Sequence, residues 1–200
     1  MNKKRNLIRV GAVLFATLGL LSCAAPPPKQ QFADITFGHL PPYMLNVARV
    51  DVVSEFKPKL EPPYVEQQFP IPPERAIRQW IHDRIKPAGV EGVAKVVIND
   101  ASVKQVDLPQ KKDLESKFTT EQTERYEAVA DVTINIYGTR GFRDGYTEAH
   151  VERSQTVPED ATLNERERIW YNMTDALMKD FNTQMEENIR TYLQKFLVKK

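Results

Sequence analysis

The alternation of apolar and polar side chains along the chain predicts several β-strands. It is clearest in residues 126–137, where every second residue is apolar: Ala128, Ala130, Val132, Ile134 and Ile136. A period of two residues is typical of a strand with one buried face and one wet face. Weaker alternation predicts strands at 45–53, 93–106 and 146–157. The polar pair Asn99-Asp100 predicts a bulge or bend in the strand at 93–106.

The segments between these strands carry turn and loop signals. Residues 138–145 contain three glycines, so we expect a turn that makes the last two strands antiparallel. The charged segment 111–124 predicts a solvated loop. Residues 56–73 contain six prolines, which exclude a regular helix or a central strand there.

A helical period appears first in residues 72–86. Pro72 and Pro73 occupy the first turn, where a helix tolerates proline. Four large apolar residues fall on one face: Ile77, Trp80, Ile81 and Ile85. Arg84 lies near the centre of that face. Its stem is expected to pack while its guanidinium reaches the sheet edge or a carboxylate, and a guanidinium that faces a ligand is the alternative.

A second and longer helix is predicted from Thr162 onward. Thr162 and Glu165 have the spacing of a capping box, and neither proline nor glycine interrupts the chain from there to Lys200. Apolar residues recur at every fourth position: Ile169, Met173, Leu177, Phe181, Met185, Ile189, Leu193 and Leu197. Because an α-helix has about 3.6 residues per turn, each step of four rotates the apolar stripe by roughly 40°. One flat sheet cannot cover the whole stripe.

The two halves of this helix are therefore expected to contact different surfaces. Residues 169–181 should pack on the sheet. The second half supports two interpretations. In one it projects as a surface for a partner or for self-association, formed by Met185, Ile189, Tyr192, Leu193 and Phe196. In the other it packs on the N-terminal segment or on the proline-rich loop.

Together these elements predict an α+β domain over residues 45–198. We expect a single four-stranded sheet, mixed or antiparallel, with two helices packed on one face and the order β-α-β-β-β-α. The first helix would allow the first two strands to be parallel, joined by a right-handed crossover. Residues 23–44 have proline clusters at both ends and predict a tether, although Phe32, Ile35 and Phe37 could instead lie along the domain.

The N-terminus has the layout of a signal peptide over residues 1–22. Lys3, Lys4 and Arg5 precede an apolar run over residues 10–21, which is shorter than the about 20 residues that a membrane-spanning helix needs. Four of the 28 Lys and Arg residues and none of the 27 Asp and Glu residues precede Cys23, so the mature chain would carry a formal charge of −3. This charge does not favour nucleic acid as a partner.

The segment Leu20-Leu21-Ser22-Cys23 resembles the lipobox of bacterial lipoproteins. The resemblance implies removal of the preceding peptide, a diacylglyceryl group on Cys23, and stable anchoring to a membrane through several acyl chains. Cys23 is the only cysteine, so it has no intramolecular disulfide partner, and lipidation would account for it. In enterobacterial lipoproteins an aspartate after the cysteine favours the inner membrane. Ala24 and Ala25 follow here, so the resemblance implies the outer membrane, on its periplasmic side.

The element order, together with the anchor, resembles that of small envelope lipoproteins such as the lipopolysaccharide-assembly lipoprotein and the auxiliary lipoproteins of ABC-type lipid-transport systems. This resemblance covers order and anchor only, and no diagnostic motif accompanies it. It implies a non-enzymatic scaffold or accessory subunit of an envelope assembly or lipid-transport complex, with an envelope protein as partner and no cofactor. The sequence leaves the oligomeric state open.

The candidate chemistry is sparse, and neither a catalytic cluster nor a metal site is predicted. His39 lies in the tether, His82 lies on the polar side of the first helix, and His150 alternates with Glu148 and Glu152 on the exposed face of the last strand. All three histidines are expected at the surface. The alternative function is a lipid or small-molecule binding module, with a cleft lined by Tyr64, Phe69, Trp80, Arg84 and Trp170.

Overall fold

The computed structural model of the chain describes residues 30–109 and 122–198. Its compact domain begins at Gln31, and every buried apolar residue of the described chain lies in this domain. The predicted signal peptide, the lipidation site at Cys23 and most of the predicted loop at 111–124 lie outside the described residues.

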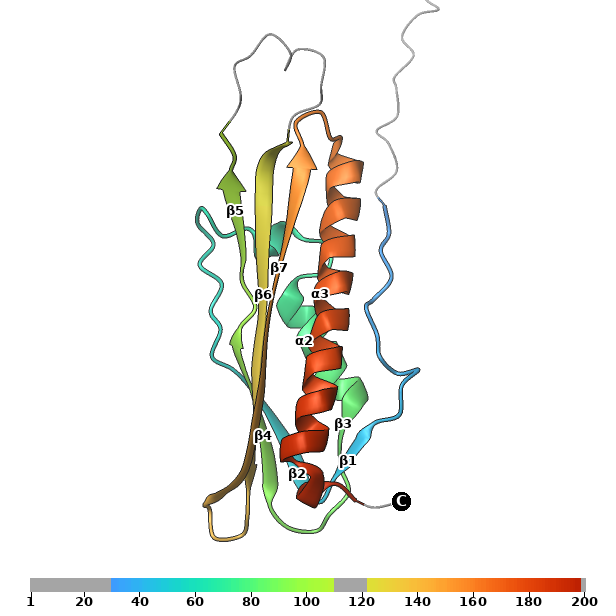
Figure 1. Cartoon of the computed structure of the whole chain (residues 1–200), viewed down its shortest axis with the longest axis vertical. Coiled ribbons are helices and arrows are strands. Elements are labelled where there is room, and N and C mark those ends of the chain that lie inside the picture. Colours follow the sequence, from blue (N-terminus) through green and yellow to red (C-terminus); the bar gives the residue numbers. More distant parts are fainter. Residues whose placement is uncertain (1–29, 110–121, 199–200) are drawn as a thin grey trace, which may run out of the picture. The chain divides into compact units, whose positions relative to one another are not determined.

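A five-stranded mixed sheet forms the centre of the domain (Figure 1). Its strands are β2 (Arg49–Ser54), β4 (Val93–Asp100), β5 (Val103–Asp107), β6 (Gln122–Tyr137) and β7 (Arg143–Pro158). Strands β2 and β4 are parallel, whereas β4, β5 and β7 are antiparallel to β6. Strand β7 pairs along the whole of one edge of β6. Strands β4 and β5 therefore share the opposite edge of β6, one after the other.

A second, two-stranded parallel sheet pairs β1 (Tyr43–Leu45) with β3 (Ile85–Pro87). The predicted α+β class is confirmed, but the prediction of a single four-stranded sheet is wrong. The predicted first strand divides into β1 and β2, and the predicted second strand divides into β4 and β5. The second division follows Asp100, whose Oδ1 accepts a hydrogen bond from the Ser102 backbone N–H at 2.9 Å. This local bond turns the chain where a bulge was expected.

Two helices pack on one side of the five-stranded sheet (Figure 1). Helix α2 (Pro73–Arg84) ends two residues earlier than predicted because the next residues enter β3. Helix α3 (Leu163–Tyr192) begins with the predicted capping box: the Glu165 N–H donates to Thr162 Oγ1 and the Thr162 N–H donates to the Glu165 carboxylate. The chain also forms two short 3₁₀ turns. The first, η1 (Glu66–Gln68), lies within the proline-rich segment 56–73, and the second, η3 (Gln194–Phe196), follows the end of α3.

The proline-rich segment covers the outer edge of β5. The Val65 N–H donates to the Val103 carbonyl at 2.9 Å, and the Gln105 N–H donates to the Pro63 carbonyl at 2.8 Å. An edge strand that would otherwise expose its backbone groups is thereby paired. Up to Pro72 the segment contains η1 but neither an α-helix nor a named strand, in agreement with its prolines.

The apolar stripe of α3 is buried along both halves of the helix. Met173, Leu177 and Phe181 in the first half and Met185 and Ile189 in the second are all in the core. Beyond the helix, the chain crosses the start of the domain: the Asn46 N–H donates to the Phe196 carbonyl at 2.7 Å, and the Val198 N–H donates to the Met44 carbonyl at 2.9 Å. The distal half of the stripe is thus part of the core, and the chain that follows α3 pairs with the N-terminal segment.

Residues 31–42, which we call the strap, lie along the helices. Ile35 and Phe37 are buried, and the ring of Phe32 stacks on that of Tyr171 at 5.0 Å between centroids. The Phe37 N–H donates to the Asp83 carboxylate at 2.8 Å. This is the alternative course that the apolar residues of the segment suggested. The strap therefore belongs to the domain, and less of the chain separates Cys23 from it.

Candidate functional site

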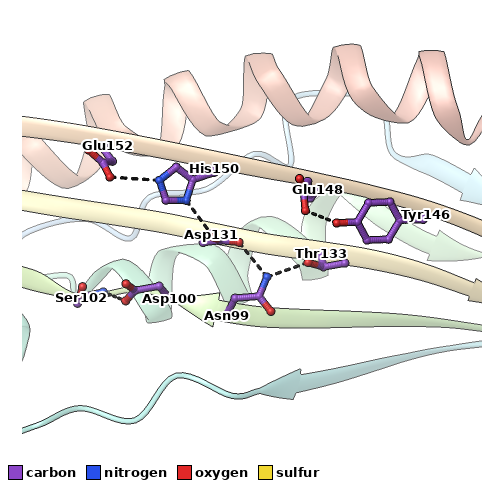
Figure 2. Close-up of polar contacts among 9 residues, drawn as sticks. All are labelled: Asn99, Asp100, Ser102, Asp131, Thr133, Tyr146, Glu148, His150 and Glu152. Carbon is purple, nitrogen blue, oxygen red and sulfur yellow. Dashed lines mark hydrogen bonds and ion pairs between the residues drawn. The ribbon is translucent and has the colours of Figure 1, made fainter.

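The face of the five-stranded sheet opposite the helices, which we call the outer face, carries a row of connected polar side chains. Figure 2 shows this polar row, which crosses three strands. Its members are Asn99 on β4, Asp131 and Thr133 on β6, and His150 and Glu152 on β7. Within the described ranges, neither helix packs over it.

Strand register positions the row. Asp131 lies directly opposite His150 in the β6–β7 pair, so both side chains project from the same face. The Asn99 amide donates to Asp131 Oδ1 at 2.8 Å and to Thr133 Oγ1 at 2.7 Å. Asp131 Oδ2 lies 2.9 Å from His150 Nδ1, and Glu152 Oε1 lies 3.2 Å from His150 Nε2. Each contact fixes the orientation of the next side chain (Figure 2).

Both ring nitrogens of His150 face carboxylates. A neutral imidazole can donate from only one nitrogen, so both hydrogen bonds form together only in the imidazolium. The hydrogen bonds to Asp131 and then to Glu152 therefore raise the pKa of His150. With two carboxylates around one imidazolium, the row presents a net negative charge to solvent.

Next to the row, an open groove of about 360 Å³ follows β7 and α3. It is lined by Tyr146, Thr147, Glu148, His150, Gln184, Asn188 and Tyr192. The Tyr146 hydroxyl donates to Glu148, which raises the pKa of Tyr146, and the Asn188 amide donates to the Glu148 carbonyl at 2.7 Å. The last contact covers a backbone group at the edge of β7 that has no neighbouring strand.

The geometry of the row suits recognition better than catalysis. A histidine that activates a nucleophile needs a hydroxyl or thiol at a ring nitrogen. Here carboxylates occupy both nitrogens of His150, and the Thr133 hydroxyl is bonded to Asn99 instead. Among the described residues, no group of three or more His, Cys, Asp and Glu side chains has the arrangement of a metal site. The row offers charged and hydrogen-bonding groups in fixed positions to a partner.

The residues predicted to line a cleft are mostly in the core. The ring of Phe69 stacks on that of Trp170 at 5.1 Å between centroids. Trp80 is buried and donates from its indole to Asn182 at 2.8 Å. Tyr64 lies apart from them on the proline-rich segment, where its hydroxyl accepts from Lys59. These aromatic side chains pack against protein and do not surround a common cleft.

Arg84 is also buried, with 1% of its surface exposed. Its guanidinium forms an ion pair with Glu186 of α3 and donates to the Pro41 carbonyl, and it lies 5.0 Å from the centre of the Tyr43 ring. The expected contact with a carboxylate is therefore present, and this guanidinium does not face an open ligand site.

The residues predicted to form a partner surface on α3 are divided by the structure. Met185, Ile189 and Leu193 are fully buried, Phe196 is half-buried and Tyr192 is 62% exposed. Core packing therefore occupies most of that predicted surface. Sequence alternation places Asp131 and Thr133 on the polar face of β6 and His150 on that of β7, but it cannot reveal the register that joins them. Thr133 is buried, although the alternation predicts a wet face there.

None of the helices in the described ranges is long and apolar enough to cross a membrane. No family model matches the chain, and a search of curated proteins finds no match. Similar solved structures include a minor lipoprotein from Acinetobacter baumannii, with 9% identity, 78% of this chain and 99% of that chain covered, and a TM-score of 0.40.

Two further solved structures are similar at the same level. A neuraminyllactose-binding hemagglutinin homolog from Helicobacter pylori has 12% identity, 78% and 96% coverage of this chain and that chain, and a TM-score of 0.36. Rare lipoprotein B from Shewanella oneidensis has 10% identity, 71% and 98% coverage, and a TM-score of 0.30. Likeness at these TM-scores does not establish a shared fold.

Proposed function

We propose that the chain is a lipid-anchored envelope lipoprotein that acts, without catalysis, as a scaffold or accessory subunit of an envelope assembly or lipid-transport complex. The lipobox ending at Cys23 supports the anchor, and Ala24 and Ala25 favour the outer membrane. The polar row is the single observation that carries the scaffold role. It is a set of fixed hydrogen-bonding groups on the outer face, which no helix of the described chain covers.

Two properties of the polar row favour a protein partner. Its members are held by cross-strand hydrogen bonds, so little side-chain freedom is lost when a partner binds. Its net negative charge would favour a partner with a basic surface and would increase the rate of encounter. Trp80 and Trp170, which were candidates to line a ligand cleft, are buried in the core. Their burial removes one argument for ligand binding and so indirectly supports the scaffold role.

Crosslinking in intact cells followed by purification of the tagged full chain tests the scaffold role. The wild-type chain should recover the same envelope proteins reproducibly. A double substitution, His150→Ala with Glu152→Ala, should lose them. The control is Asp175→Ala with Lys179→Ala, which removes an exposed ion pair of 2.6 Å on α3. If the tagged protein were reproducibly recovered without any partner, the scaffold role would be contradicted.

The anchor has a separate test. The mature protein purified from membranes should begin at Cys23 and carry the added mass of a diacylglyceryl group. A Cys23→Ser chain should lack that mass and leave the membrane fraction. An unmodified cysteine in the wild-type mature protein would contradict the anchor.

The alternative function is a lipid or small-molecule binding module. The open groove favours it because the exposed rings of Tyr146 and Tyr192 flank polar groups from β7 and α3. Mass spectrometry of the natively purified domain discriminates between the two functions. A stoichiometric ligand that is lost in a Tyr146→Ala, Tyr192→Ala variant would favour the binding module, whereas a ligand-free domain would favour the scaffold.

A further inference from the structure

Exposed apolar side chains gather at one end of the domain. Val90, in the loop between β3 and β4, is 91% exposed, and Phe142, in the turn between β6 and β7, is 69% exposed. Both line one surface hollow of about 380 Å³ together with the half-buried Phe196, which follows α3. Figure 1 shows the two loops and the end of α3 at the same end of the domain. Three segments that are distant in sequence thus bring large apolar side chains to one place.

Cationic side chains accompany these apolar ones. They are Arg140, Arg143 and Lys195, all exposed. Lys195 lies over the ring of Phe196, with its Nζ 4.7 Å from the ring centre. Glu91 and Asp144 are the acidic residues that line the same hollow. Over the three segments that form this end, residues 88–92, 138–144 and 194–197, the three basic residues accompany these two acidic ones. The excess of one basic residue contrasts with the negative charge of the mature chain as a whole.

We propose that this end, formed by Val90, Phe142 and Phe196 with Arg140, Arg143 and Lys195, seats in the head-group region of an anionic lipid bilayer. We call it the apolar end. Its most exposed side chains stand at the tips of two loops, which suits insertion into an interface better than docking against a flat protein surface. The guanidinium and ammonium groups beside them can pair with lipid phosphates while the apolar groups enter the acyl boundary.

The contact itself does not require the proposed lipid anchor. The strap begins beside the first part of α3, where Phe32 stacks on Tyr171, whereas the apolar end lies beyond the last turn of that helix. Lipid affinity of the apolar end can therefore be measured in the absence of the anchor. Residues 31–200 are suitable for this measurement because the compact domain contains the whole described core.

Vesicle flotation tests the proposal. Residues 31–200 should float with vesicles of phosphatidylcholine that contain about one-third phosphatidylglycerol, and several-fold less with phosphatidylcholine alone. Val90→Glu with Phe142→Glu should reduce the bound fraction about tenfold, because two inserted apolar side chains become charged. The matched control is Leu60→Glu with Leu163→Glu, at leucines 72% and 67% exposed elsewhere on the domain, and it should bind as wild type.

Two outcomes of flotation would overturn the proposal. One is no binding to the anionic vesicles, which would leave the apolar end to a protein partner. The other is an equal loss of binding in both double variants. Circular dichroism of each variant checks that it remains folded, so a loss of binding can be assigned to the surface.

A fluorescence measurement locates the contact independently. The native tryptophans Trp80 and Trp170 are buried, so an added exposed tryptophan will dominate any change in emission. The emission maximum of the Phe142→Trp variant should shift to shorter wavelength when anionic vesicles are added, and that of the Leu163→Trp variant should not. A shift only in Leu163→Trp would contradict the proposal. Neither result affects the scaffold test, which concerns the outer face.

Discussion

At the residue scale, one buried cation joins three parts of the domain. Arg84 on α2 pairs with Glu186 on α3 and donates to the Pro41 carbonyl in the strap. Removal of one member of such a pair leaves the other partners without compensation. Arg84→Ala should therefore lower the free energy of unfolding by about 3 kcal/mol in urea denaturation.

The control for this prediction lies on the same helix. Arg78 pairs with Glu74 at 2.8 Å on the surface. Arg78→Ala should cost no more than about 0.5 kcal/mol, because exposed pairs are screened by solvent. Equal effects of the two substitutions would mean that Arg84 does not join the helices and the strap as described.

The polar row gives a second residue-scale prediction. Its carboxylates raise the pKa of His150 above the ordinary 6.5. Folding therefore favours the protonated ring, and this contribution to stability is fully present below about pH 6.5 and is lost as the pH rises through the folded-state pKa. In NMR titration, Asp131→Asn should lower the pKa of His150, and Asp175→Asn should not. A His150 pKa that Asp131→Asn leaves unchanged would refute the bridging geometry.

At the element scale, the length of α3 shows what a sequence pattern can and cannot predict. The capping box at Thr162 correctly predicted where α3 begins. Whether its distal half projects or packs was undecided from sequence, and the structure buries Met185 and Ile189 in the core. Strand β3 and its pairing with β1 were missed, because three-residue strands carry little alternation and form only by pairing with a distant segment.

Substitutions at neighbouring positions test the packing of the distal end of α3. Leu193→Ala should lower the free energy of unfolding by about 2–4 kcal/mol, because Leu193 is fully buried. Tyr192→Ala, one residue earlier and mostly exposed, should change it by less than about 0.5 kcal/mol. If Leu193→Ala were as mild as Tyr192→Ala in urea denaturation, the distal end of α3 would not be packed in the core.

At the scale of the whole molecule, the domain has two chemically different surfaces besides its core. The outer face carries the polar row, and the apolar end carries Val90 and Phe142. Alternation predicted the wet face of β6 but not the row, since the row depends on the register of Asp131 with His150. The prediction of a cleft beside Trp80 was wrong, because apolar periodicity shows that a side chain is buried but not whether protein or a ligand packs against it.

The scaffold role through the outer face is the central claim, and site-specific photocrosslinking in intact cells tests it most directly. A photoreactive residue at Lys104 or Ser154, both exposed on β5 and β7, should capture a defined envelope protein. The same residue at Lys179 or Glu187, exposed on α3, should not. Capture only from the α3 positions, or from none of the four, would contradict the account.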